Sequence, residues 1–329
     1  MYDVLVIGGS GVDTTVRVPE LPFETRDSLH VPPVRDHVGN TGSGYARACH
    51  RLGLRTGLVD LIGDDPQGEM IRETFAREGL DFHHLISPAG TPRSVNLVDG
   101  TGRRMSLHDG RHPVDLRIPV EFARPLIAEA RHVHQSITGV NRDLFGEIRA
   151  AGATVSTDLH DWDGEQAHHL DYALGSDLVF LSAVALRDRR DEVMERIRAD
   201  GRARVVVATD GDRGCHVLTG DGLLRVPAIR PDEVFASLPE WRGWSCVDSN
   251  GAGDAFASGF LWAWTRGESI AECATAGSIA GAYTCRSAGT HTDLIDAAGL
   301  AAARQAVPGA VTKSINSSTR PSSAGSRSV

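Results

Sequence analysis

Residues 248–256 read Asp-Ser-Asn-Gly-Ala-Gly-Asp-Ala-Phe, and this stretch decides how the rest of the chain is interpreted. Its Gly-Ala-Gly turn leads at once into a helix-compatible run that extends to Thr265. The start of a helix leaves backbone N–H groups unpaired and carries partial positive charge, so it suits a phosphate. Asp254 would lie beside such an anion hole, where it could take a proton from an incoming hydroxyl. The alternative is an ordinary helix cap after a turn that Gly251 and Gly253 permit.

The length and composition of the chain predict a protein with a large hydrophobic core. Its 329 residues suit one large α/β domain, and 41% of them are apolar. No run approaches the ~18 apolar residues of a membrane helix. The first residues are acidic rather than basic, unlike a signal peptide. We therefore expect a soluble, cytoplasmic protein.

Charge and residue usage exclude several classes of partner. The net charge of −9 argues against nucleic acid or an anionic membrane. The five cysteines are scattered and form no Cys-x-x-Cys, which predicts free thiols, and the histidine pairs lack metal-site spacing. Lys313 is the only lysine of the sequence, so neither a Walker A loop nor a protein-kinase lysine exists in the folded part. Phosphate charge must instead be met by helix N-termini, arginine and bound cations.

The N-terminal segment imitates a dinucleotide fingerprint. Val4 to Ile7 predicts a buried strand, and Gly9-x-Gly11 follows it. The fingerprint requires a third glycine at position 14, where this chain has Thr14, and a helix that prolines 19 and 22 disfavour. An NAD-binding oxidoreductase is therefore kept only as an alternative of another class.

From residue 66 onward, helical and strand patterns alternate, which predicts a parallel sheet covered on both faces. Ligands of such sheets bind at the carboxyl ends of the strands. Four polar residues fall at or near predicted strand ends: Asp13, Asp158, Ser182 and Thr209. The predicted helices are 67–78, 142–150, 186–199 and 270–283, and the predicted strands are 132–137, 154–158, 178–181 and 205–209.

Two segments read as strands outside the main sheet. Residues 14–37 alternate in part and contain four prolines, and residues 92–110 form a hairpin pattern around Asp99-Gly-Thr-Gly. Arg93, Arg103 and Arg104 in the second segment could face a substrate, although such charges are more often solvated.

The string 248–256 closely resembles the C-terminal signature of the ribokinase (PfkB) family of carbohydrate and nucleoside kinases, Asp-Thr-x-Gly-Ala-Gly-Asp-x-Phe. The resemblance implies a catalytic base at Asp254 and an anion hole from the N–H groups of Gly251, Ala252 and Gly253. It implies that Asp13 holds substrate hydroxyls. It also implies an α/β, ribokinase-like fold: a mostly parallel central sheet with helices on both faces, and a small β lid made by 14–37 and 92–110 that covers the sugar and can pair two subunits.

Two further stretches resemble signatures of the same family. Residues 39–46 followed by Arg-Leu-Gly resemble its N-terminal signature, which implies substrate contacts from Gly39, Asn40 and Gly42. Gly44 stands where the family has a substrate-binding asparagine, so an amide contact to the sugar is lost. Residues 209–214 resemble the nucleotide loop Thr-x-Gly-x-x-Gly, which implies ATP contacts from Thr209, Gly211 and Gly214.

Other positions match less completely. The family's strand ending in Asn-x-x-Glu helps to organise Mg²⁺, but Ser182 and Ala185 stand there. Either Mg²⁺ is held by nucleotide phosphates, water and other carboxylates, with Asp158 and Asp161 as candidates, or activity is altered. Ser182 and Ser278 align with the nucleotide site. Asp248, with the glycine at 289, aligns with a monovalent-cation loop, which implies K⁺.

Four strings, residues 93–98, 155–164, 180–183 and 279–283, resemble a narrower group of these kinases, which phosphorylates a cyclitol hydroxymethyl group of a pseudo-oligosaccharide. We therefore expect ATP-dependent phosphorylation of a primary hydroxyl by a kinase domain spanning 1–308, as a possible homodimer, followed by a disordered tail (309–329). A kinase for a simple hexose or nucleoside and a non-catalytic sugar-binding protein remain alternatives.

Overall fold

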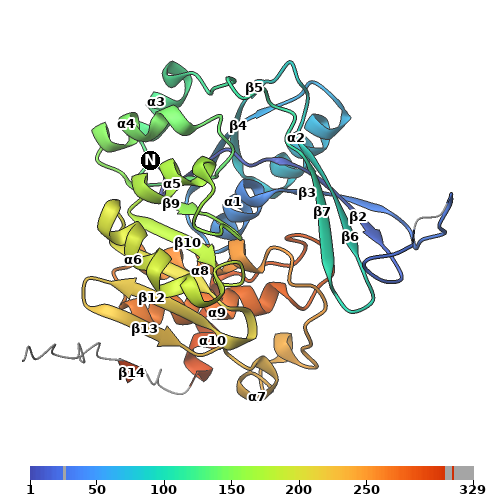
Figure 1. The fold of residues 1–329 in the computed structure, drawn as a ribbon, viewed down its shortest axis with the longest axis vertical. Helices are drawn as coiled ribbons and strands as arrows, with labels where there is room; N and C mark the ends of the chain where they lie inside the picture. Colours follow the sequence, from blue (N-terminus) through green and yellow to red (C-terminus); the bar gives the residue numbers. More distant parts are fainter. Residues whose placement is uncertain (25–26, 308–312, 315–329) are drawn as a thin grey trace, which may run out of the picture.

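The described residues form a ten-stranded sheet with a four-stranded sheet beside it (Figure 1). The computed structural model describes residues 1–24, 27–307 and 313–314. The order of the large sheet is β14-β13-β12-β11-β10-β9-β8-β1-β4-β5. Strands β11 to β5 run parallel, and β12, β13 and β14 add antiparallel pairs at one edge. The mostly parallel α/β sheet is confirmed.

The strands of the large sheet have these bounds: β1 Val4–Ile7, β4 Thr56–Ile62, β5 Asp81–Ile86, β8 His132–Gln135, β9 Thr154–Asp158, β10 Leu178–Ser182, β11 Val205–Thr209, β12 Cys215–Thr219, β13 Gly222–Val226 and β14 Lys313–Ser314. Every residue of β1 and β4 is buried, because the sheet is covered on both faces and neither face of these strands meets water. Apart from β14, the predicted tail lies outside the described residues.

Helices cover both faces of the large sheet. Their bounds are α1 Thr41–Arg51, α2 Pro66–Glu78, α3 Val120–Ala128, α4 Phe145–Ala150, α5 Ala167–Gly175, α6 Arg190–Asp200, α7 Pro231–Val234, α8 Ala252–Trp264, α9 Ile270–Thr284 and α10 Ala297–Ala306. Val4 and Val6 pack in the core shared with α1, α8 and α9, whereas Leu5 and Ile7 pack in the core shared with α3 to α6. No helix in the described part of the chain is long and apolar enough to span a bilayer.

The small sheet is the lid. Its order is β3-β2-β6-β7, with bounds β2 Gly11–Arg17, β3 Arg35–Gly39, β6 Arg93–Val98 and β7 Arg104–Asp109. Figure 1 shows these strands side by side, projecting from the body of the molecule. The lid begins at Gly11 rather than at residue 14, because the chain passes straight from β1 into β2. A strand in place of a helix after Gly11 also removes the dinucleotide-fingerprint interpretation.

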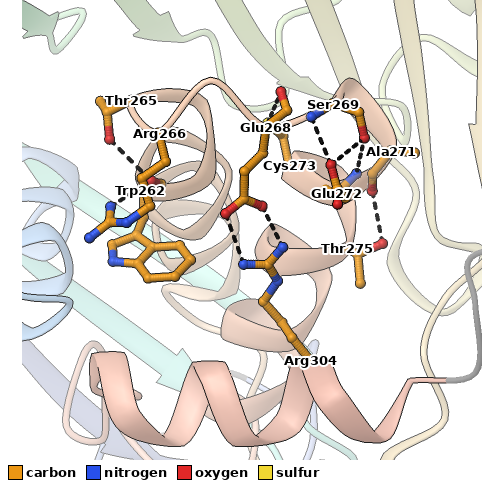
Figure 2. Close-up of polar contacts among 10 residues, drawn as sticks. All are labelled: Trp262, Thr265, Arg266, Glu268, Ser269, Ala271, Glu272, Cys273, Thr275 and Arg304. Atoms are coloured by element: carbon orange, nitrogen blue, oxygen red, sulfur yellow. Dashed lines mark hydrogen bonds and ion pairs between the residues drawn. The ribbon is translucent and has the colours of Figure 1, made fainter.

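The connection between α8 and α9 is held in place by a contact from α10 and by the N-terminal cap of α9. Figure 2 shows Arg304 of α10 reaching Glu268 in this connection, with Nη1 donating to Oε1 at 3.0 Å. Ser269 begins α9 with a capping box, in which Glu272 Oε2 accepts the Ser269 N–H at 2.9 Å. These contacts fix the connection that joins the C-terminal end of α8 to the start of α9.

Three predicted elements differ from the structure by more than one residue at an end. The predicted helices 142–150 and 186–199 each begin with a 3₁₀ turn, Arg142–Leu144 and Arg187–Arg189. Short 3₁₀ turns are frequent at helix N-termini, and the periodicity of the sequence does not separate them from the α-helix that follows. The predicted strand 132–137 ends at Gln135, where the chain turns over the carboxyl edge of the sheet.

Two buried histidines on β8 should make the fold sensitive to acid. Ser156 Oγ lies 2.8 Å from His132 Nε2 and 2.9 Å from His134 Nδ1, and the His134 ring stacks on Tyr45 at 3.7 Å. Burial lowers the pKa of His132 to about 3, and it lowers the pKa of His134 well below its ordinary value, with the neighbouring His132 adding to the effect.

A protein with these folded-state pKa values loses stability as pH falls. The unfolded chain binds protons at these positions below pH ~6.5, whereas the folded chain does not until pH approaches 3. Each histidine can then contribute a slope of up to about 1.4 kcal/mol per pH unit to the free energy of unfolding. Urea unfolding of the wild type and His132→Gln between pH 7.5 and 4.5 should give a shallower decline for the variant. Parallel declines would contradict this expectation.

Candidate active site

One large cavity lies between the lid and the carboxyl edge of the large sheet. Its volume is about 940 Å³, which is in the range of sites for nucleotides and similar ligands. The carboxyl ends of β9, β10 and β11 meet it from one side, and the N-terminus of α8 enters from another. The predicted site residues on its wall are Asp13, Asn40, Asp158, Ser182, Thr209, Gly251, Gly253 and Asp254.

Asp254 stands in the first turn of α8, as its position in the sequence predicted. Gly251 is the N-cap with a left-handed φ of 80°, and both Gly251 and Gly253 line the cavity. The Ala252 N–H, one of the three amides expected in the anion hole, donates to Ser249 O at 3.2 Å. Asp254 is buried, and its Oδ2 has a partner while its Oδ1 has none among the described residues. The arrangement places one free carboxylate oxygen beside a positively polarised helix start.

A second buried carboxylate, Asp158 at the end of β9, shares the cavity with Asp254. Its Oδ1 accepts the His160 N–H at 2.8 Å, and its Oδ2 faces Gly253. Burial raises the pKa of Asp158; the nearby His160 opposes the shift and the charge of Asp254 adds to it. A cation between the two carboxylates would relieve this repulsion.

Asp13 and the lid form a polar wall opposite α8. Asp13 lies on β2, a lid strand, rather than after a strand of the main sheet, and its Oδ1 is buried without a partner among the described residues. A Cβ at Gly39 would lie 2.3 Å from Asp13 Oδ2, so the predicted Gly39 acts by making room for this carboxylate. Ser94 Oγ contacts His108 Nδ1 at 3.0 Å and Asn40 Oδ1 at 3.3 Å. Hydroxyl, amide and imidazole groups suit a polyhydroxylated ligand.

Arg103 and Arg104 of the lid segment differ in whether they line the cavity. Arg103 donates to Asp99 at 2.8 Å and is turned away from the cavity, as expected of a solvated charge. Arg104 lines the cavity and donates to Asn250, next to the α8 N-cap. It therefore brings a guanidinium from the lid to the loop that precedes α8, and guanidinium groups are well suited to binding phosphate.

Several predicted residues support the site without lining it. A Cβ at Gly42 would lie 1.8 Å from Gly8 O, so this glycine lets α1 pack against the end of β1. Gly214 has φ 97° and fits against Val226 O, which shapes the loop after Thr209. Gly211 and Ser278 are likewise absent from the cavity wall.

Asp248 is buried in the loop that precedes the α8 N-cap. Its Oδ1 accepts the Asn250 N–H at 3.0 Å, its Oδ2 accepts the Gly289 N–H at 3.1 Å, and Arg17 lies 3.8 Å from Oδ2. The pairing of Asp248 with Gly289 brings together the two loops that the sequence assigned to a monovalent cation. Among the described residues no group of three or more His, Cys, Asp or Glu side chains is arranged to hold a metal ion.

The sequence did not identify His291. This residue follows α9, is buried, and lies with its Nε2 2.7 Å from Asp254 Oδ2. A Cβ at Gly44 would lie 2.0 Å from the His291 ring, so the imidazole fills the space at the position where the sequence lacks the family's asparagine. The one available signal was Gly44 itself, because a glycine inside a helix often marks a close approach by another group.

Comparison with known proteins gives one consistent result. The model of the pfkB family of carbohydrate kinases matches residues 1–297. The acarbose 7(IV)-phosphotransferase of Actinoplanes sp. is 46% identical over 301 residues, which cover 91% of this chain and 97% of that protein.

Solved structures agree with the sequence comparison. The microbiome-derived acarbose kinase Mak1 superposes with a TM-score of 0.84 at 41% identity, covering 92% of this chain and 99% of that one. The ribokinase of Arabidopsis thaliana, complexed with ribose and ATP, has a TM-score of 0.75 at 17% identity and covers 92% of this chain and 99% of its own. This last likeness concerns the fold alone.

Proposed function

The chain belongs to the pfkB family of carbohydrate kinases and is an ATP-dependent sugar kinase, and we propose that its acceptor is the cyclitol hydroxymethyl group (the 7-position) of acarbose or of a related pseudo-oligosaccharide. The observation that carries this proposal is the 46% identity over 91% of the chain to an acarbose 7(IV)-phosphotransferase. The polar cavity wall of Asn40, Ser94 and His108 supports it, because a pseudo-oligosaccharide presents many hydroxyls to such a wall.

The transfer step uses Asp254 as general base. Its free Oδ1 accepts the proton of the acceptor's primary hydroxyl while the oxygen forms a bond to the γ-phosphorus of ATP. The bond between the γ-phosphorus and the β,γ-bridging oxygen breaks in line, and ADP leaves with that oxygen. Asp13 holds neighbouring hydroxyls of the acceptor, so the reacting oxygen is oriented before transfer.

Charge on the moving phosphoryl group is met by the start of α8. The Gly251 and Gly253 backbone lies at the cavity wall, and the helix macrodipole adds partial positive charge there. Ala252 contributes by fixing the turn, and its N–H joins the anion hole only if its bond to Ser249 O opens. On the donor side we assign Thr209 and Ser182 to the nucleotide, with Gly211, Gly214 and Ser278 shaping the surrounding surface.

The residues present fit Mg²⁺ held mainly by ATP. Mg²⁺ commonly binds one or two carboxylates together with phosphate oxygens and water, rather than an all-protein cage. We assign such a carboxylate to Asp158, whose Oδ2 faces Gly253. When bound, the ion would neutralise phosphate charge. The K⁺ site at Asp248 stays a prediction, since both carboxylate oxygens already accept N–H groups.

A homodimer through the lid also stays a prediction. The lid strand β7 is exposed along its whole length, and Met105 and Leu107 are about half exposed. Apolar side chains on an unpaired edge strand are suited to pairing with a second sheet.

An acceptor panel tests the proposed function. Acarbose, fructose, ribose and adenosine are compared by ADP release with ATP and Mg²⁺. We expect acarbose to have a kcat/KM at least about 10²-fold above the other three, because a polar pocket rejects acceptors that leave its groups unpaired. Phosphorus–proton correlation NMR should place the phosphate on the cyclitol hydroxymethyl group.

Other outcomes of the panel identify the rival functions. Preferred turnover of fructose or of adenosine would indicate a hexose or nucleoside kinase. Tight acarbose binding without ADP release would indicate a sugar-binding protein that does not transfer phosphate.

A further inference from the structure

His291 is held in an unusual position at the reaction centre. It lies in the loop between α9 and α10, only 1% exposed, with its ring on the cavity wall and a left-handed φ of 56°. Residues other than glycine rarely adopt this conformation, and they keep it only where the surroundings enforce it. Here the surroundings include the carboxylate of Asp254, 2.7 Å from Nε2.

Two glycines make room for the imidazole. A Cβ at Gly44, in α1, would lie 2.0 Å from His291 Cε1 and Nε2, and a Cβ at Gly251, the N-cap of α8, would lie 2.6 Å from Cδ2. Gly44 is an interior residue of α1, where glycine is less favourable than alanine. The ring is thus seated between the starts of two helices, in a space that no larger residue at position 44 would leave open.

Only one of the two ring nitrogens of His291 has a hydrogen-bond partner among the described residues. A carboxylate accepts and does not donate, so the proton of the Nε2–Oδ2 contact belongs to Nε2. In the neutral ring Nδ1 is then an acceptor. Nδ1 of His291 is buried and has no hydrogen-bond partner among residues 1–24 and 27–307. His291 lines the cavity, whereas Nδ1 itself is covered in the ligand-free protein, so a donor that arrives with the ligand reaches Nδ1 when the cavity adjusts around it.

We propose that His291 positions the catalytic base and helps to bind the acceptor. Its Nε2–H holds Oδ2 of Asp254, which leaves Oδ1 directed to the hydroxyl that is phosphorylated. Its Nδ1 accepts a hydrogen bond from a second hydroxyl or N–H group of the same acceptor. This inference rests on the proposed function, in that it assigns a further residue to the same transfer site.

Three substitutions at position 291 separate the two roles. His291→Asn suits the left-handed backbone and keeps a polar atom near Nδ1, but it is too short to reach Asp254. We expect its kcat to fall about 10–10²-fold, because small misplacements of a reacting group have effects of this size, with little change in the acceptor KM. His291→Gln can reach Asp254 but lacks Nδ1, so its acceptor KM should rise about 10-fold with kcat changed less. His291→Ala should show both effects.

The KM for ATP should stay unchanged in all three variants. A purely structural histidine would lower stability and activity alike in each variant, without dividing the effects between kcat and the acceptor KM. That outcome would overturn the proposal.

A second pair of variants tests whether Gly44 provides the space that the His291 ring occupies. Gly44→Ala should lower both Tm and kcat, since its Cβ would meet the imidazole. In the His291→Ala background the same change should leave Tm equal or higher, because no ring is present and alanine favours the helix. Equal losses of Tm in both backgrounds would show that Gly44 does not serve His291.

Nitrogen NMR of imidazole-labelled protein separates this inference from the proposed function. In the free protein we expect His291 to carry its proton on Nε2, and we expect added acarbose to shift the Nδ1 resonance. A proton on Nδ1 in the free protein would overturn the His291 assignment whatever the acceptor is. Failure of the wild type to phosphorylate any acceptor of the panel would overturn the proposed function, while the free-protein spectrum would still decide the contact with Asp254.

Discussion

Turnover of an Asp254→Asn variant is expected to fall about 10²–10⁴-fold, the range for loss of a general base. The asparagine Oδ1 can still accept the His291 Nε2–H, so the contact now 2.7 Å long need not be lost and the fold should persist. The amide cannot take the acceptor's proton. Binding of ATP should change little, because the helix N-terminus that meets the phosphates is unaltered.

The measurement combines steady-state turnover with calorimetric titration of ATP. Asp296→Asn serves as the matched control, because Asp296 caps α10 through the Gly299 N–H at 2.8 Å, away from the cavity, and asparagine caps equally well. The control should retain wild-type turnover. Near-normal turnover of Asp254→Asn itself would remove this residue from the role of base.

Replacement of Asp13 by alanine should affect the acceptor and spare the nucleotide. A carboxylate that accepts two hydroxyl hydrogen bonds contributes roughly 3–4 kcal/mol to holding a sugar, which corresponds to about 10²–10³-fold in kcat/KM. The KM for ATP should stay the same, since Asp13 lies on the lid. The Tm should be equal or higher, because Asp13 Oδ1 is buried without a partner among the described residues and its removal relieves that cost.

Asp36→Asn provides the comparison for Asp13. Asp36 lies on the neighbouring lid strand, is exposed, and accepts a hydrogen bond from Thr14 Oγ1 at 2.6 Å. Its substitution should change neither kinetic parameter. An Asp13→Ala variant that loses stability but keeps its acceptor kcat/KM would indicate a structural role for Asp13 and would contradict the lid assignment.

The linear sequence predicted the features that are specified by neighbouring residues. The turn 251–253 and the following helix were predicted because glycines and a helix start produce an anion site locally. The parallel sheet followed from the alternation of helices and strands, and Asp158, Ser182 and Thr209 were placed at strand ends that all meet one edge of that sheet. These predictions need only local conformation and the common direction of parallel strands.

The sequence predicted less well which residues contact one another when they lie far apart in the chain. Gly39 and Gly42 were expected to contact the substrate; this stays a prediction, and the structure shows that they make room for Asp13 and for Gly8. The carboxylate of Asp248 was assigned to a cation, yet it joins two loops through N–H groups of Asn250 and Gly289. A sequence motif indicates which residue types belong to a site, whereas tertiary packing decides which of those residues face the cavity.

The sequence by itself determined the class of fold, the glycine turn with the helix that follows it, and the carboxylate of Asp254 in the first turn of that helix, because each is specified by neighbouring residues. Only the tertiary structure decided that His291 stands against Asp254. That contact requires α1, α8 and the loop after α9 to converge, and it requires Gly44 to leave space for the ring. The pattern of one segment carries no information about which distant side chain will fill a gap beside it, so a close packing of this kind is visible only when the chain is folded.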